Sequence, residues 1–191
     1  MKSLLAIVCL SSIATLSHAD WALNLDDSSF SFASIKKNHA YEIHTFNRYE
    51  GRISDSGEAE LTLDLASVHT GIEIRDQRMQ SMLFDIPKFP AASYRVKVDP
   101  EQLKALKPGQ RMAVNAEGTL SILGIEKPLP AALNVFKLSD HRLQVNTAHP
   151  IALKAQDYGL DSGIEALRKV ANLPVISLTV PINFSLVFDQ Q

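Results

Sequence analysis

The sequence predicts an all-β domain in which eight antiparallel strands close into a single barrel, with one or two short helices. Apolar and polar residues alternate with a period of two along much of the chain, as in strands with one buried face. Short turn-forming runs separate these segments, and connections this short imply antiparallel neighbours. Two segments, 110–123 and 174–188, far exceed the usual strand of about five or six residues. Such length favours a curved barrel wall over a two-sheet sandwich.

The strands follow in chain order from the alternation and from the turns between them. The clearest runs from Ile176 to Phe188, with apolar residues at every even position. Gly118 is expected to supply a bend within its long strand. The eight predicted strands are 28–36, 41–53, 59–65, 94–98, 110–123, 129–138, 143–153 and 174–188. Turns are expected at 54–57, 107–109, 124–128 and 139–141, where glycine, proline, serine and aspartate gather.

Helical signatures interrupt the alternation at two places. Thr70 is followed three residues later by Glu73, which is the sequence motif of a capping box. The apolar residues that follow extend to 83. Ser162 and Glu165 repeat this motif at the start of a second predicted helix. Pro174 ends that helix before the last strand. A shorter helical turn is expected at 100–106.

The N-terminus is typical of a secretory signal peptide. It combines Lys2, an apolar run over 4–10, and small residues at Ser17 and Ala19. We therefore expect a signal peptide at 1–19, cut after Ala19, and one domain at 20–191 in an exported, soluble protein. No later segment approaches the ~20 apolar residues of a membrane-spanning helix. Disulfides are not expected, because the single cysteine is in the part to be removed.

The charge of the chain argues against a nucleic-acid partner. The chain has 19 Lys and Arg against 21 Asp and Glu, and removing one lysine with the signal peptide leaves a net charge of −3. A nucleic-acid binder is expected to carry a positive field or a clustered basic stripe. The basic residues here are scattered, so nucleic acid is not an expected partner.

The stretch 67–84, which reads SVHTGIEIRDQRMQSMLF, followed by FPAA at 89–92, resembles the YceI-like family. The resemblance extends to Trp21 with 28–32, to 44–46 with Gly51, to 118–120 with Gly124, and to the closing strand, so it covers essentially the whole mature chain. It implies a lipocalin-like eight-stranded barrel whose interior holds a long isoprenoid or comparable lipid. It also implies a periplasmic protein without catalytic chemistry.

Under this resemblance the ligand would contact the apolar face of the strands, with methionines as adaptable fillers. The candidate lining residues are Phe30, Phe32, Phe46, Met79, Met82, Met112, Phe136, Phe184 and Phe188. Each could equally be part of a packed core. For the polar head of a ligand the candidates are Arg75, Arg78 and Tyr158, the last on a lid. The two arginines could equally form ion pairs or anchor the helix to the barrel.

The sequence lacks three known catalytic and metal-binding motifs: a nucleophile elbow, a phosphate-binding loop and a zinc-binding helix. There is no Gly-x-Ser-x-Gly elbow, no phosphate-binding glycine loop and no zinc-binding histidine pair on a helix. We therefore expect no metal, no cofactor and no enzyme. The resemblance to the YceI-like family implies instead a carrier for a quinone, prenyl phosphate or fatty amide. Two alternatives stay open, a small periplasmic hydrolase or isomerase acting on a lipid in the same cavity and a module with a filled barrel. A homodimer through an apolar face also stays open.

Overall fold

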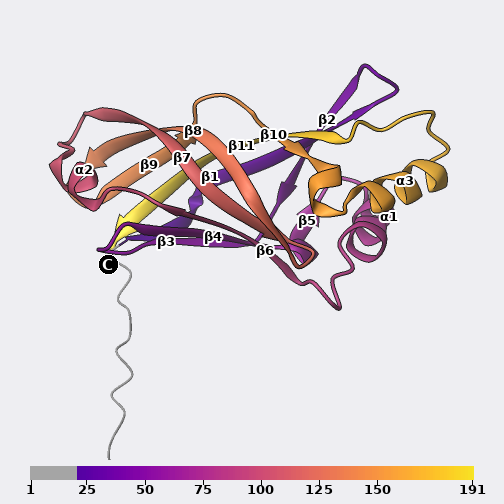
Figure 1. The fold of residues 1–191 in the computed structure, drawn as a ribbon, viewed down its shortest axis with the longest axis horizontal. Helices are drawn as coiled ribbons and strands as arrows, with labels where there is room; N and C mark the ends of the chain where they lie inside the picture. Colours follow the sequence, from indigo (N-terminus) through magenta and orange to yellow (C-terminus); the bar gives the residue numbers. More distant parts are fainter. Residues whose placement is uncertain (1–20) are drawn as a thin grey trace, which may run out of the picture.

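The computed structural model describes residues 21–191, so the predicted signal peptide and its cut after Ala19 lie outside the described residues. Most of the described chain is in strands (Figure 1). These are β1 (Trp21–Lys36), β2 (Ala40–Phe46), β3 (Tyr49–Ile53), β4 (Glu58–Asp64), β5 (Val68–His69), β6 (Ala91–Lys97), β7 (Arg111–Ile122), β8 (Ile125–Ser139), β9 (Arg142–Thr147), β10 (Ile151–Lys154) and β11 (Thr179–Gln190). The helical segments are η1 (Leu65–Ser67), α1 (Glu73–Arg78), η2 (Met79–Leu83), α2 (Pro100–Ala105), η3 (Ala155–Tyr158) and α3 (Asp161–Val170).

Eight antiparallel strands form a closed barrel, which confirms the predicted fold class. The ring runs β11-β9-β8-β7-β6-β4-β3-β1, and the pairing of β1 with β11 closes it. Strand β2 pairs with 31–36 of β1, on the edge that meets β3 at Trp21 and Ala22. Strand β10 likewise pairs with 179–182 of β11, and β9 with 185–189. The predicted strands 41–53 and 143–153 are therefore real but interrupted.

The barrel wall parts beside the first half of β8. Strand β8 pairs with β7 along its whole length, but its pairing with β9 begins only at Leu133. Pro128 and Pro130 lie in the half without a second neighbour, where the missing N–H of a proline costs no ladder hydrogen bond. The predicted start of this strand at 129 and the predicted turn at 124–128 are therefore wrong. The turn is only Leu123 and Gly124, both with positive φ (51° and 74°).

Helices cover one end of the barrel, where α1, η2 and α3 lie together, while α2 lies at the other end (Figure 1). Gly163 of α3 makes close contact between these helices. A Cβ there would lie 2.7 Å from the carbonyl oxygen of Met82 and 2.8 Å from Cα of Leu83. Because both are backbone atoms of η2, a side chain at this position would force the helices apart.

Both predicted capping boxes are wrong, although both helices exist. The N-cap of α1 is Ile72, which provides no side-chain cap, and Thr70 instead donates to Asp76. The N-cap of α3 is Leu160, so Ser162 lies inside the helix. The third predicted helix, α2, is capped by Asp99, whose side chain accepts a hydrogen bond from the N–H of Glu101.

Gly118 of β7, where the sequence predicts a bend, lies against a neighbouring side chain. The ring of Tyr94, from the neighbouring strand β6, lies directly over it, and a Cβ at 118 would lie 2.1 Å from that ring. The hydroxyl of Tyr94 donates to the carbonyl of Leu129 at 2.9 Å. Burial raises the pKa of Tyr94 to about 12, so the phenol stays neutral. The absent side chain at 118 thus lets one tyrosine cross the inside of the barrel.

Candidate functional site

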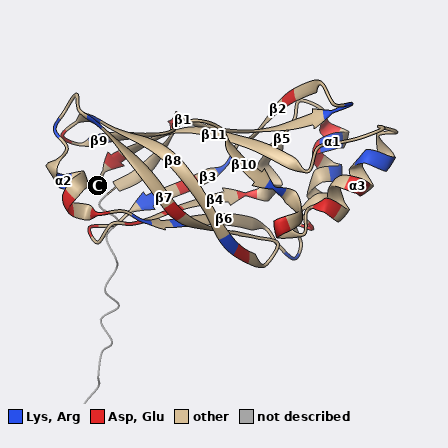
Figure 2. Cartoon of the chain, turned by 45° about the horizontal axis from the view of Figure 1, so that its top comes forward, with Lys and Arg blue, Asp and Glu red and all other residues tan. Residues whose placement is uncertain are grey.

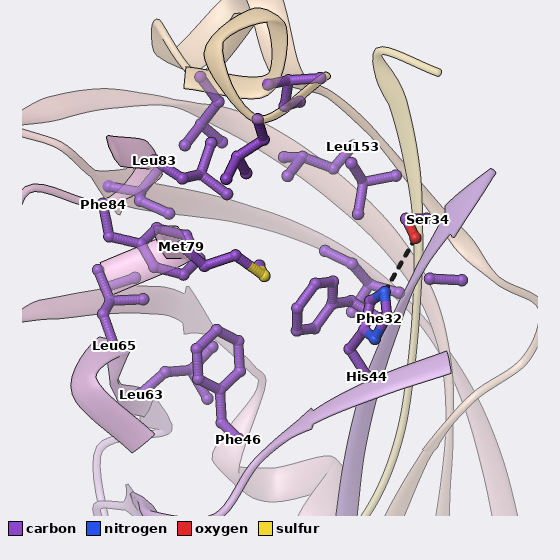
Figure 3. Close-up of a pocket in the computed structure, with 18 of the residues that line it drawn as sticks. Phe32, Ser34, His44, Phe46, Leu63, Leu65, Met79, Leu83, Phe84 and Leu153 are labelled. Atoms are coloured by element: carbon purple, nitrogen blue, oxygen red, sulfur yellow. Dashed lines mark hydrogen bonds between the residues drawn. The ribbon is translucent and has the colours of Figure 1, made fainter. Parts of the chain in front are cut away.

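A cavity of about 450 Å³ lies at the helix-covered end of the barrel. Its wall comes from the inner faces of the strands, and α1, η2, α3 and the segment 171–177 complete it. Apolar side chains form most of its lining, as Figure 3 shows for Leu63, Leu65, Leu83, Phe84 and Leu153. Ligand cavities of this size and character hold small or elongated apolar molecules.

Five of the nine predicted lining residues lie in this cavity: Phe30, Phe32, Phe46, Met79 and Phe184. The aromatic rings form a connected group. The centroid of Phe32 is 5.3 Å from that of Phe46, and Phe30 stacks on Phe184 with centroids 6.4 Å apart. Met79 comes from η2 and reaches toward these rings from the helix side (Figure 3).

The other four predicted residues do not line this cavity. Met112 and Phe188 belong to inner-face positions of β7 and β11, but they lie near the α2 end, where side chains fill the barrel. Phe136 alternates with the buried residues Val135 and Lys137 and faces outward. Met82 is half-buried in η2 and does not line the cavity. Alternation identifies the inner face of a strand but not how far along it the cavity extends.

Two polar lining residues, one on the inner face of β1 and one on that of β2, were not predicted as cavity residues. Ser34 follows Phe30 and Phe32 at intervals of two along β1, and His44 precedes Phe46 on β2. The signal that could have found them is therefore the same alternation that identified the phenylalanines.

His44 and Ser34 form a hydrogen-bonded pair in the cavity wall (Figure 3). The Nε2 atom of His44 is 2.9 Å from the Ser34 hydroxyl oxygen, and the imidazole is only 3% exposed. Burial, followed by the nearby charge of Arg75, lowers the pKa of His44 to about 4. The imidazole is therefore neutral at pH 7. Its other nitrogen, Nδ1, has no hydrogen-bond partner among residues 21–191.

Charged groups gather beside this pair at the end of the cavity. The Glu42 carboxylate accepts hydrogen bonds from Lys36, at 2.6 Å, and from Arg75. These contacts, above all the hydrogen bond from Lys36, hold the pKa of the Glu42 carboxyl below its usual value. Arg75 also donates to the hydroxyl and the carbonyl of Thr70, at 2.7 and 2.6 Å. Arg75 thus anchors α1 to β2, one of the roles that the sequence left open.

Arg78 differs from Arg75 although both line the cavity. Within the described residues its guanidinium has no ion pair or side-chain hydrogen bond. Acidic and basic side chains alternate along α1, whereas α3 has its acidic residues first and its basic residues in the last turn; Figure 2 shows both signs on these helices. This end of the molecule therefore carries both signs of charge, with Arg78 available for a ligand.

The prediction that Tyr158 presents an amphipathic ring on a lid is wrong. Tyr158 is buried in η3, and its hydroxyl donates to the carbonyl of Lys127 on β8 at 3.3 Å. Burial raises its pKa. The residue fastens η3 across the parted wall beside β8.

Metal binding and membrane crossing are two further functions to consider for residues 21–191. No group of three or more histidine, cysteine, aspartate or glutamate side chains is arranged to hold a metal ion. None of the helices in this range has the length and apolarity that a bilayer crossing requires.

Comparison with known proteins gives one family and several related structures. A family model described as the YceI-like domain matches residues 21–188. A polyisoprenoid binding domain from Saccharophagus degradans, implicated in plant cell wall breakdown, is similar, with 39% identity and a TM-score of 0.89 over 91% of this chain and 100% of that chain. BcnA of Burkholderia cenocepacia has 19% identity and a TM-score of 0.67 over 86% of this chain and 98% of that chain. A Campylobacter jejuni YceI protein has 16% identity and a TM-score of 0.56 over 78% of this chain and 84% of that chain. At these identities the last two show the fold alone. No curated protein matches the chain.

Proposed function

Because the chain belongs to the YceI-like domain family, we propose that it is a periplasmic carrier that holds a long isoprenoid or similar lipid inside its barrel. The observation that carries the proposal is the apolar cavity of about 450 Å³ at the helix-covered end. The polyisoprenoid binding of the Saccharophagus degradans domain, which is 39% identical, supports it.

Burial of the lipid chain supplies the driving force. Each methylene removed from water contributes about 0.8 kcal/mol, whereas association costs roughly 4–15 kcal/mol. A few prenyl units offset this cost without any specific polar contact. The apolar interior therefore selects the chain of the ligand by length and girth, a requirement that quinones, prenyl phosphates and fatty amides can all meet.

The proposed contacts follow from the lining. The rings of Phe30, Phe32, Phe46 and Phe184 form the apolar bed, and Met79 adapts to the shape of the chain. Of the two predicted head-group arginines, only Arg78 is free to contact a polar end at the mouth, because Arg75 is engaged by Glu42 and Thr70.

Protein purified from its own host is expected to release a long-chain lipid at near one-to-one stoichiometry. Native mass spectrometry of the intact protein, followed by organic extraction, measures this directly. The same intact mass shows whether the mature chain starts after Ala19, as the periplasmic assignment requires. Repeated failure to recover or rebind any prenyl lipid would exclude the carrier.

A second candidate is a hydrolase acting on a lipid ester in the same cavity. The observation that favours it is the Ser34 hydroxyl, 2.9 Å from Nε2 of His44, as in a nucleophile and base pair. Two facts oppose it. No acidic group orients the imidazole through Nδ1 in the described chain, and a pKa of about 4 makes His44 a weak base at neutral pH.

A test of the hydrolase uses long-chain p-nitrophenyl esters with the wild type and with Ser34→Ala. The carrier proposal predicts equally low release of nitrophenol by both proteins. A rate in the wild type that falls at least 100-fold in Ser34→Ala would establish the hydrolase instead.

A further inference from the structure

The unpartnered Nδ1 atom of His44 is the one feature of the cavity wall that a purely apolar ligand leaves unexplained. The imidazole is almost fully buried, and its other nitrogen already bonds to Ser34. Leaving a buried polar atom without a partner costs free energy, so native structures rarely tolerate it. In a ligand cavity, the ligand is a natural source of the missing partner.

We propose that the His44–Ser34 pair binds the polar end of the lipid and that this end is an uncharged oxygen, a carbonyl or a hydroxyl, in preference to a phosphate. The inference rests on the proposed carrier function and adds the chemistry of the ligand's polar end. It also makes His44 a residue that determines specificity.

The His44–Ser34 pair can form a hydrogen bond with either kind of oxygen, because a neutral imidazole carries its proton on either nitrogen, depending on the tautomer. If Ser34 donates to Nε2, then Nδ1 carries the proton and donates to a ligand carbonyl. If Nε2 donates to Ser34, then Nδ1 accepts from a ligand hydroxyl. No other described residue bonds to the Ser34 hydroxyl, so it is free to turn and serve both arrangements.

The charges around the pair leave no surplus for an anion. The groups whose fields reach His44 are two cations, Lys36 and Arg75, and two anions, Glu42 and Asp76. Glu42 pairs with both cations, and Asp76 accepts from the backbone and hydroxyl of Thr70. The imidazole adds no charge at pH 7. A phosphate here would lose its hydration without gaining an unpaired cation.

The ring of Phe32 lies next to the His44 imidazole. This ring lies between those of His44 and Phe46, with centroids 5.3 Å from each (Figure 3). Phe32 is only half-buried and is itself a lining residue. We infer that it turns aside when the ligand oxygen binds and then packs against the first part of the apolar chain.

Three probes with nearly the same branched chain test the proposal at pH 7.5: phytol, phytane and phytyl phosphate. Displacement of a fluorescent apolar dye measures their affinities. Wild type is expected to bind phytol about tenfold more tightly than phytane, the value of one buried hydrogen bond. Phytyl phosphate is expected to bind no more tightly than phytol.

Variants of His44 separate its two nitrogens. His44→Gln places its amide near the position of Nε2, where it can still bond Ser34, and should reduce the preference for phytol to less than twofold. His44→Asn places its amide near Nδ1 and should retain part of the preference. His149→Gln, the same change at an exposed histidine, should leave the preference as in wild type.

Each result decides the proposal. Equal affinities for phytol and phytane in wild type would overturn it without any variant. So would a preference that survives in folded His44→Gln. Tighter binding of phytyl phosphate that Arg78→Gln abolishes would place the polar end at the mouth instead. Failure of all three probes to bind would contradict the carrier function itself, whereas binding of phytane with no preference for phytol would contradict only the His44 subsite.

Discussion

Ala92→Phe is expected to lower the affinity for phytol about 50-fold while the barrel stays folded. Ala92 is 2% exposed on β6, lies opposite Leu63 of β4 and lines the cavity. A phenyl ring there occupies space that a bound chain would fill. If it displaces about three methylenes at ~0.8 kcal/mol each, the loss is roughly 2.4 kcal/mol, which is about 50-fold in affinity. Dye displacement measures the affinity, and thermal unfolding shows that the fold is retained.

The matched control for this substitution is Ala91→Phe. Ala91 is the preceding residue of the same strand, is exposed and faces away from the barrel interior. The Ala91→Phe substitution adds the same ring at the neighbouring position and should leave the affinity for phytol within twofold of wild type. Equal affinities of Ala92→Phe and wild type would mean that the lipid does not occupy this cavity.

Acidification from pH 7.5 to 5 is expected to lower the free energy of unfolding by about 2 kcal/mol through His44 alone. Its pKa is about 4 in the folded protein, against an ordinary value of 6.5. Between these values the unfolded chain binds a proton that the folded chain does not, so stability falls as the pH falls from about 6.5 to 4. Above about pH 7 both states are neutral, and below about pH 4 both are charged. The contribution therefore levels off at each end.

Urea unfolding of wild type and His44→Gln over this pH range isolates the effect. Glutamine does not titrate and can keep the bond to Ser34, so the two curves of stability against pH should diverge between pH 6.5 and 5. Titrating groups away from His44, such as the Asp189 carboxyl paired with Arg142, are common to both proteins and cancel. Parallel curves would show that His44 is not held neutral by burial.

The strands were predictable because each has its own local signal. The alternation over 176–188 depends only on which face of the chain is buried, and it places the even-numbered residues inside, although β11 begins only at Thr179 and not at the predicted 174. The ends of strands were less predictable. Pro128 was placed in the predicted turn 124–128, yet it lies within β8, where that part of the strand has only one neighbour. A sequence does not show which strand edge is unpaired.

The candidate site was only partly predictable for the same reason. Phe30 and Phe188 follow the same inner-face pattern, but Phe30 lines the cavity and Phe188 lies in the filled end of the barrel. Thr70 was expected to cap a helix by a local rule, yet it forms hydrogen bonds with Asp76 and Arg75. Arg75 in turn donates a hydrogen bond to Glu42 on β2. Tyr158 was expected on a surface lid and instead closes a gap in the wall. Each of these roles depends on a partner distant in the sequence or on the packing of a whole region.

Residue alternation and turn chemistry act over a few residues, so they are enough to predict an all-β barrel of eight antiparallel strands with an apolar inner face. Where the barrel stays open, and which polar atoms reach the cavity, follow only from the assembled fold. Those outcomes depend on how helices from 73–83 and 161–170 pack over one end. They also depend on the burial of His44, which left one nitrogen without a partner. Burial and pairing are properties of the assembled fold, so no local pattern carries them.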